Sequence, residues 1–370
     1  MIILNIKADN FYCFKNFEID LSYKKKNSKS LIENEYLENY NNIHFKKLNV
    51  IIGCNASGKT VFGKLLSDIL GFIENRDDKI LNSIPYLDKE SNFSIDFVIN
   101  NEKYILYRVE CKIKNSFVKN LKIQSANINK KDSYLKTTER FETICCLEGN
   151  DDEFLSPEMM RALKRINLKS NALFCFTDEI ISGNKIIKYD IKVLNTVLKI
   201  FDNSIKEITP VENTEDGYLI HFNHGTKLLI QNGKTVEGDI LSSGTKEGLS
   251  IAYIISEMKK NPNRIFYIDE KFSHVHTDIE QTALSIMVEL LGKEAQLFFT
   301  THNLDVLEMN IPNRSFTFFS KRYDEVKVIH PEKELQNQND RNLRNKVEND
   351  LFGTVPDYSE LYSLIGDING

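Results

Sequence analysis

The chain has 370 residues, of which 41% are hydrophobic and 27% are charged, and its formal net charge is −5. This balance is that of a globular protein large enough to bury a full core, and it excludes a disordered or collagen-like chain. The slightly acidic total gives no general attraction to nucleic acid. Apolar runs such as residues 48–53 are far shorter than the about 20 residues that a membrane-spanning helix needs.

Cysteine usage bears on the compartment of the protein. The six cysteines, at positions 13, 54, 111, 145, 146 and 175, lack metal-ligand spacing, and no targeting segment is visible. We therefore expect reduced thiols, a cytoplasmic location and no membrane association.

The first seventy residues begin with strand patterns and end in a strand followed by a helix. Residues 2–6 and 11–19 predict two strands, and the polar stretch 22–44 predicts an excursion that is partly helical or mobile. Residues 47–52 are apolar and β-branched, as in a buried strand. Residues 61–70 then have the apolar spacing of a helix.

A long middle region follows, over residues 75–237. Alternating patterns at 93–99 and 104–109 predict a hairpin, and residues 221–228 predict another. Between them, residues 153–205 look mainly helical.

Residues 103–140 carry ten Lys or Arg against three Asp or Glu, a local charge of +7. Such a stretch is typical of a solvated hairpin face, but it is also able to bind nucleic-acid phosphates. The residues available for phosphate contact are Lys112, Lys114, Lys119, Lys122, Lys130 and Lys131.

From residue 240 onward, strand and helix patterns alternate. The predicted elements are a helix at 245–259, a strand at 264–269, a helix at 277–291, a strand at 295–300, a short helix at 303–309 and a strand at 315–320. This alternation predicts an α/β fold with a mostly parallel sheet flanked by helices and right-handed crossovers. We expect four segments: 1–74 and 238–330 as two halves of one core, 75–237 as the antiparallel β and helical middle region, and 331–370 as a helical tail.

The clearest motif spans residues 53–60 and matches the G-x-x-x-x-G-K-[ST] phosphate-binding loop at every fixed position. It lies between a predicted strand and a predicted helix, as that loop requires. Backbone N–H groups would cradle phosphates, Lys59 would reach the β- and γ-phosphates of ATP, and Thr60 would bind Mg²⁺. The simpler alternative is a glycine-rich turn with a chance lysine. The candidate nucleotide-binding residues here are Gly53, Asn55, Ala56, Ser57, Gly58, Lys59 and Thr60.

Residues 264–268 form an apolar run that ends in two carboxylates, Asp269 and Glu270. With the phosphate loop upstream, we expect Asp269 to bind Mg²⁺ through water and Glu270 to polarise the attacking water. The alternative is an acidic strand end at a turn.

Two further motifs flank this strand. Residues 241–245 resemble the Leu-Ser-Gly-Gly-Gln signature of ABC-type ATPases, with Ser243 and Thr245 as departures, and Ser242, Ser243 and Gly244 as candidate ATP contacts. A capped helix start at Ser242 or Ser243 is the alternative. The second motif, residues 297–303, is an apolar strand that ends in Thr-Thr-His-Asn.

His302 in that motif matches the switch histidine of ABC-type ATPases, which contacts the γ-phosphate; the alternative is a structural histidine at a strand end. His274 and His276 follow Glu270 closely, but without a third ligand they do not make a metal site. Taken with the phosphate loop, this set resembles ABC-like ATPases of the overcoming-lysogenization-defect (OLD) class, related to SMC and recombination-repair ATPases. Thr277 departs from the Leu-His-Pro stretch of that class, and only Gln124, by default, is a candidate for its glutamine loop.

The resemblance implies a P-loop NTPase with an ABC-type head that binds ATP and Mg²⁺ and works as a nucleotide-dependent homodimer or higher homo-oligomer. In such proteins the signature loop completes the nucleotide site of the opposite subunit. No TOPRIM-type nuclease region follows the core, so the resemblance is to stand-alone ATPase subunits of bacterial phage-defence cassettes. These subunits act as sensors or regulators of a separately encoded effector, in some cases a nuclease.

The alternative is an SMC-like DNA-repair or DNA-binding ATPase, for which the basic stretch 103–140 speaks and the lack of heptad repeats counts against. A self-sufficient nuclease is disfavoured because no further carboxylate cluster or zinc set is present. A transporter ATPase is disfavoured because the middle region does not look like a helical insert that docks on membrane domains.

Overall fold

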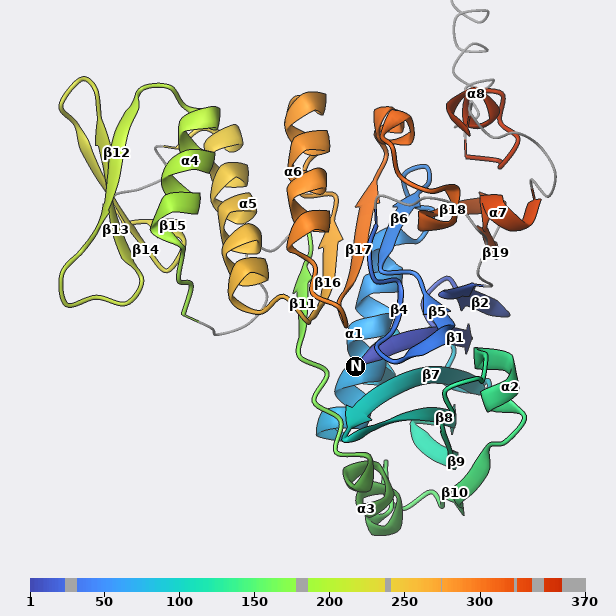
Figure 1. The fold of residues 1–370 in the computed structure, drawn as a ribbon. Coiled ribbons are helices and arrows are strands. Elements are labelled where there is room, and N and C mark those ends of the chain that lie inside the picture. Colours follow the sequence, from blue (N-terminus) through green and yellow to red (C-terminus); the bar gives the residue numbers. More distant parts are fainter. Residues whose placement is uncertain are drawn as a thin grey trace, which may run out of the picture.

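The computed structural model describes residues 1–23, 32–177, 186–236, 241–273, 275–322, 325–334 and 343–354. Figure 1 shows their arrangement as two larger sheets, two smaller sheets and the helices packed between and beside them.

A six-stranded central sheet carries the phosphate-loop strand. Its strands lie in the order β11 (Ala172–Cys175), β16 (Ile265–Asp269), β17 (Gln296–Thr301), β6 (Leu48–Ile52), β18 (Phe316–Arg322) and β19 (Glu325–Ile329). The first five are parallel, and β19 returns antiparallel to β18. Every residue of β16, β17 and β6 is buried, which explains why these strands are continuous apolar runs. The predicted parallel α/β core is therefore confirmed.

A second six-stranded sheet is antiparallel and joins the chain start to the middle region. Its order is β10 (Glu142–Glu148), β9 (Phe117–Asn127), β8 (Lys103–Lys114), β7 (Ser91–Asn101), β1 (Ile2–Asp9) and β2 (Phe17–Asp20). The predicted hairpin is confirmed as β7 and β8. Because β1 pairs with β7, the segments 1–74 and 75–237 share this sheet.

Helices divide the interior into two main cores. α1 (Lys59–Asn75) packs with the antiparallel sheet and one face of the central sheet, through residues such as Phe62 and Phe72. α5 (Ser243–Lys260) and α6 (Thr277–Leu290) contribute to the core on the other face. Figure 1 shows α6 beside β16 and β17, with α5 and then α4 (Ile191–Phe201) farther from the sheet.

A smaller sheet stands at the edge of the molecule beyond α4 (Figure 1). It consists of β12 (Ile205–Pro210), β13 (Gly217–Phe222), β14 (Lys227–Gln231) and β15 (Lys234–Thr235). The hairpin predicted near residues 221–228 is confirmed as β13 and β14.

Two predictions of helical structure were wrong in part. In the excursion 22–44, the described residues form β3 (Ser22–Tyr23), β4 (Tyr36–Leu37) and β5 (Tyr40–Phe45) rather than a helix. Within 153–205, β11 lies between α3 (Pro157–Ile166) and α4 and pairs with β16. β11 has only four residues, too few for a periodic signal.

The remaining elements are short. They are η1 (Lys79–Ser83), α2 (Tyr134–Thr138), η2 (Leu304–Glu308), η3 (Asn313–Ser315), α7 (Pro331–Glu334) and α8 (Leu343–Glu348). The short helix expected at 303–309 is the 3₁₀ helix η2. In the tail, α7 and α8 lie among the described residues, while 355–370 fall outside them.

Candidate functional site

The phosphate loop connects the end of β6 to the start of α1, as its sequence requires. A Cβ at Gly53 would come within 2.5 Å of both the Phe319 carbonyl oxygen and Ser57 Oγ, so the loop needs glycine there. Gly58 has φ +100°, a left-handed conformation that favours glycine. It begins α1 without a side-chain cap, which leaves the helix N-terminal amides for another acceptor.

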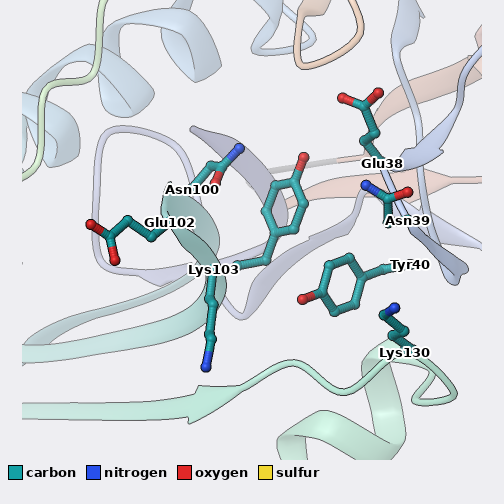
Figure 2. Close-up of a pocket in the computed structure, with 8 residues that line it drawn as sticks. Glu38, Asn39, Tyr40, Asn100, Glu102, Lys103 and Lys130 are labelled. Atoms are coloured by element: carbon teal, nitrogen blue, oxygen red, sulfur yellow. The ribbon is translucent and has the colours of Figure 1, made fainter.

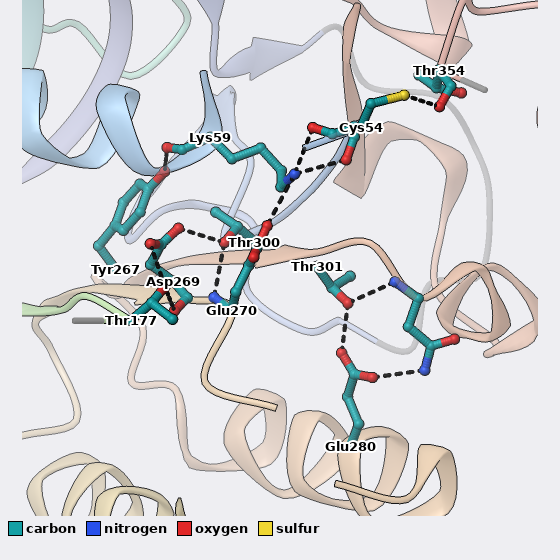
Figure 3. Close-up of polar contacts among 12 residues, drawn as sticks. Cys54, Lys59, Thr177, Tyr267, Asp269, Glu270, Glu280, Thr300, Thr301 and Thr354 are labelled. Atoms are coloured by element: carbon teal, nitrogen blue, oxygen red, sulfur yellow. Dashed lines mark hydrogen bonds and ion pairs between the residues drawn. The ribbon is translucent and has the colours of Figure 1, made fainter. Parts of the chain in front are cut away.

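Lys59 is buried inside this loop and its ammonium is surrounded by acceptors (Figure 3). Its Nζ donates to the carbonyls of Gly53 at 2.7 Å and Cys54 at 3.0 Å, and forms an ion pair with Glu270 Oε1 at 3.0 Å. The structure therefore brings together two residues that the sequence assigned to one site. The buried Tyr267 hydroxyl donates to the Lys59 carbonyl at 2.5 Å and so fixes the helix start against β16.

Asp269 ends β16 and is completely buried. Its carboxylate accepts from the Thr300 hydroxyl at 2.8 Å and from the Thr177 hydroxyl at 3.0 Å. Burial, reinforced by the charge of Asp269, raises the pKa of Tyr267 well above its usual value. The phenol therefore stays neutral and available as a donor.

Thr177 is a site residue that the sequence did not reveal. It follows β11, and its hydroxyl also contacts the Asp269 carbonyl at 3.1 Å. Only the parallel pairing of β11 with β16 brings Thr177 to Asp269.

The glutamine-loop candidate Gln124 does not lie near this contact. It is in β9 of the antiparallel sheet, where its exposed amide donates to Thr143 Oγ1 at 3.5 Å.

Glu270 has a left-handed backbone, with φ +47°, directly after the strand. Its N–H donates to the Thr300 carbonyl at 3.3 Å and hydroxyl at 3.1 Å. Such a conformation is uncommon for a non-glycine residue and carries a cost. The residue that adopts this conformation, Glu270, is also the one whose carboxylate forms the ion pair with Lys59.

The predicted Mg²⁺ ligands fit a hard cation in their chemistry. Thr60 lies half-buried in the first turn of α1 and offers a hydroxyl, and Asp269 offers a carboxylate. Within the described ranges, no group of three or more His, Cys, Asp or Glu side chains is placed to hold a metal. A cation here would thus need phosphate or water oxygens to complete its coordination.

Ser242, Ser243 and Gly244 form the start of α5. Ser242 is the N-cap, and its Oγ accepts from the Thr245 N–H at 3.1 Å, as the capping interpretation requires. Ser242 and Ser243 are exposed. The Lys59 ammonium contacts Gly53, Cys54 and Glu270, none of which belongs to α5.

His302 is exposed and lies between Thr301 and Asn303, which share one carboxylate, that of Glu280; Figure 3 shows the Glu280 and Thr301 side chains. Glu280 of α6 accepts from the Thr301 hydroxyl and from the Asn303 amide, each at 2.7 Å. Glu280 is buried, which raises the pKa of its carboxyl group. His276 caps α6, its Nδ1 accepting from the Asp278 N–H at 3.3 Å, while His274 lies outside the described residues.

The chain's tail also reaches the phosphate loop. The Cys54 thiol donates to the Thr354 carbonyl, and Ser320 Oγ donates to the Gly353 carbonyl at 2.8 Å. Phe352 stacks on Phe318, with ring centroids 4.5 Å apart. The sequence did not predict this contact.

A separate polar pocket of about 290 Å³ lies between β5, the β7–β8 turn and the loop before α2 (Figure 2). None of the residues predicted for the nucleotide site lines it; its walls include Glu38, Tyr40, Lys103 and Lys130, and Lys130 is one of the candidate phosphate contacts of the basic stretch 103–140. No helix within the described residues combines the length and the apolar character that crossing a membrane requires.

Comparisons with known proteins give no match to a family model or to a curated protein. Among solved structures, the chain is similar to an SMC head bound to the C-winged-helix domain of ScpA, with a TM-score of 0.50 and 13% identity, covering 90% of this chain and 100% of that one. It is also similar to the SMC head domain from Thermotoga maritima (TM-score 0.45, 13% identity, 89% of this chain and 99% of that one). A third similar structure is the recombination mediator protein RecF-ATPrS (TM-score 0.41, 12% identity, 88% and 98%). At these identities the first likeness concerns the fold, and the chain therefore has a fold similar to that of an SMC head.

Proposed function

We propose that this protein binds and hydrolyses ATP as an ABC-type ATPase that works as a nucleotide-dependent dimer. The observation that carries the proposal is the 3.0 Å approach of Glu270, at the end of β16, to Lys59 of the phosphate loop. A cation that binds phosphate and a carboxylate able to accept a proton from water thus lie at one point.

In this proposal the backbone of residues 53–58 and the N-terminus of α1 bind the phosphates, and Lys59 exchanges its carbonyl and Glu270 partners for phosphate oxygens. Glu270, released from the ion pair, orients the attacking water and takes its proton. A bound Mg²⁺ would neutralise phosphate charge, and Thr60 and Asp269 would hold it. His302, exposed on its turn, would contact the γ-phosphate.

The position of the signature residues supports the proposed dimer. Ser243 and Gly244 begin an 18-residue helix, and Ser243 is exposed on the single chain. A phosphate bound at Lys59 of one subunit would meet this helix N-terminus from the other, so that nucleotide joins the two copies.

The experiment measures the mass of the Glu270→Gln protein in solution with Mg-ATP, with Mg-ADP and without nucleotide, together with wild-type ATPase activity at several protein concentrations. We expect a doubling of mass with Mg-ATP only, and a specific activity that rises with concentration. Wild-type activity that is independent of concentration in a monomer would contradict the shared site. Failure to bind nucleotide would contradict the ATPase itself.

The resemblance to stand-alone OLD-class ATPases supports a finer hypothesis, in which the dimer senses and regulates a separately encoded effector in antiphage defence. Co-purification of the neighbouring gene product with the Glu270→Gln protein, with and without Mg-ATP, tests it. If the amount of co-purified protein were the same with and without Mg-ATP, a nucleotide-controlled switch would be contradicted.

The DNA-binding alternative rests on the basic stretch 103–140. Half of its ten basic residues form ion pairs: Arg108 with Asp96, Lys112 with Glu90, Lys119 with Asp151, Lys122 with Glu110 and Arg140 with Asp132. These pairs reduce the charge available to phosphates and favour the solvated-face interpretation. Salt-dependent DNA binding by the purified protein would reverse that preference.

A further inference from the structure

A buried acidic residue outside the predicted site, Glu280, accepts hydrogen bonds from the turn that carries His302. Glu280 lies one turn into α6 and is 3% exposed, and each of its two carboxylate oxygens accepts a hydrogen bond at 2.7 Å. One donor is the hydroxyl of Thr301 and the other is the amide of Asn303. The carboxylate therefore fixes the residue on each side of His302, and His302 itself is exposed.

The end of β17, which precedes His302, also forms a hydrogen bond with Asp269 of the candidate ATP site. Thr300 and Thr301 are adjacent in β17, so their side chains point to opposite faces. Thr300 donates to Asp269 at 2.8 Å, whereas Thr301 donates to Glu280 at 2.7 Å. The end of β17 thus lies between two buried carboxylates, one belonging to the candidate ATP site and the other to α6.

Within the turn, Thr301 Oγ1 also accepts from the Asn303 N–H at 3.0 Å, and the Asn303 side chain caps η2 through the Asp305 N–H at 3.0 Å. The polar atoms named in this cluster therefore have partners, and a displacement of Thr301 or Asn303 would break at least one of these bonds. Such networks are rigid, and small displacements of a catalytic group are costly.

We infer that Glu280 is a positioning residue for the proposed ATPase reaction: it holds His302 where the γ-phosphate is to be contacted. This inference rests on the proposed function. In the proposed ATPase reaction, Glu280 contacts no reacting atom and acts only through its hydrogen bonds to Thr301 and Asn303.

The test compares kcat and the affinity for a fluorescent ATP analogue in Glu280→Ala, His302→Ala and the double variant. We expect Glu280→Ala to lower kcat by about tenfold to a hundredfold, with nucleotide affinity within about twofold of wild type. In the His302→Ala background it should lower kcat no further, since both changes remove the same interaction. Additive losses would overturn the inference and leave Glu280 as an ordinary core contact.

Two variants sharpen the result. Glu280→Gln can still accept from Asn303 and donate to Thr301, and we expect it to restore most of the activity. Gln281→Ala, the matched control, removes a 2.8 Å bond from the same helix to the Asp305 carbonyl beyond His302 and should leave kcat near the wild-type value. An equal loss in Gln281→Ala would show that general docking of α6 matters, which contradicts the inference.

The same set of variants distinguishes a folding defect, or an absent ATPase activity, from the loss of the positioning role. If Glu280→Ala does not fold, Thr301→Val removes, at similar volume, the hydroxyl that donates to Glu280 and accepts from the Asn303 N–H, and it undergoes the same double-variant comparison. Wild-type protein without ATPase activity would remove the proposed function and this role together. An active wild type with an unchanged Glu280→Ala would overturn the positioning role alone.

Discussion

Lys59 and Glu270 form an ion pair, with 3.0 Å between Nζ and Oε1, in which the lysine side chain is 3% exposed and the glutamate side chain 20% exposed. The pair joins the start of α1 to the end of β16, and the lysine also binds the Gly53 and Cys54 carbonyls. In the proposed reaction, a phosphate that binds Lys59 would displace Glu270, and the freed carboxylate would lie next to that phosphate.

The first prediction concerns this exchange. Glu270→Gln removes the charge that competes with phosphate for Lys59, so we expect nucleotide affinity to equal or exceed that of wild type. Turnover should fall by about a hundredfold or more, because the amide cannot accept a proton from water. Single-turnover kinetics and analogue binding measure the two quantities. Glu289→Gln, at an exposed position of α6, is the matched control and should behave as wild type. Turnover near wild type in Glu270→Gln would remove Glu270 from the mechanism.

The second prediction concerns the contact of Gly63 in α1 with Tyr267. A Cβ at Gly63 would lie 2.4 Å from the Tyr267 ring, which is buried and cannot move freely. We expect Gly63→Ala to lower the free energy of unfolding by about 1–3 kcal/mol through overpacking.

The matched control is Gly71→Ala in the same helix. A Cβ there meets only Asp77 Oδ1, at 3.9 Å. In a helix interior, replacing glycine by alanine without strain should raise stability by about 0.5–1 kcal/mol. Urea unfolding of both variants gives the comparison, and a stabilised Gly63→Ala protein would contradict the observed packing.

The third prediction concerns the tail over the phosphate loop. Phe352 stacks on Phe318, and the Thr354 carbonyl accepts from the Cys54 thiol. Burial raises the pKa of Cys54 and so slows its alkylation. We expect Phe352→Ala to release the tail and speed maleimide labelling of Cys54 several-fold, as read by mass spectrometry.

Two references accompany the labelling experiment. Cys146 is exposed, and its rate should not change. Leu351→Ala replaces a neighbouring side chain that is 59% exposed and should leave Cys54 at the wild-type rate. Equal labelling of Cys54 in all three proteins would show that the tail does not shield the loop.

The fourth prediction is a pH dependence that arises at His330. Burial, followed by the charges of Lys46 and Lys333, lowers the pKa of His330 to about 2. Its Nδ1 lies 3.0 Å from Lys46 Nζ, and because an ammonium only donates, this nitrogen accepts and the ring is neutral. The unfolded chain takes up a proton below its ordinary pKa of about 6.5, whereas the folded chain does not.

Stability from this residue is therefore complete above about pH 6.5 and declines as the pH falls toward the folded pKa, by at most about 1.4 kcal/mol per pH unit. His330→Asn keeps an acceptor near Lys46 but does not titrate. We expect the stability difference between wild type and His330→Asn to shift in favour of the variant between pH 7.5 and pH 5.5, measured by urea unfolding. Parallel stability curves would contradict a neutral buried histidine.

Much of the fold was predictable because its signals are local. The buried runs of β6, β16 and β17 and the apolar spacing of α1 and α6 each lie within a short window, and the structure confirms them. β11, β3 and β4 were missed because they have only four, two and two residues, and β5 was missed because its first half is polar; such segments gain their strand character from neighbours in a sheet.

The candidate site divides in the same way. The phosphate-loop motif and the carboxylates after β16 are recognisable from the sequence, because both motifs are contiguous and their chemistry depends on residue type. The contact of Thr177 with Asp269 across 92 positions, and that of Thr354 with Cys54 across 300, depend on how the chain packs. The same is true of the hydrogen bonds by which Glu280 holds Thr301 and Asn303, the neighbours of His302. These contacts form where strand ends and helices meet in space, and a threonine or glutamate has no distinctive pattern along the chain until that packing gives it a partner.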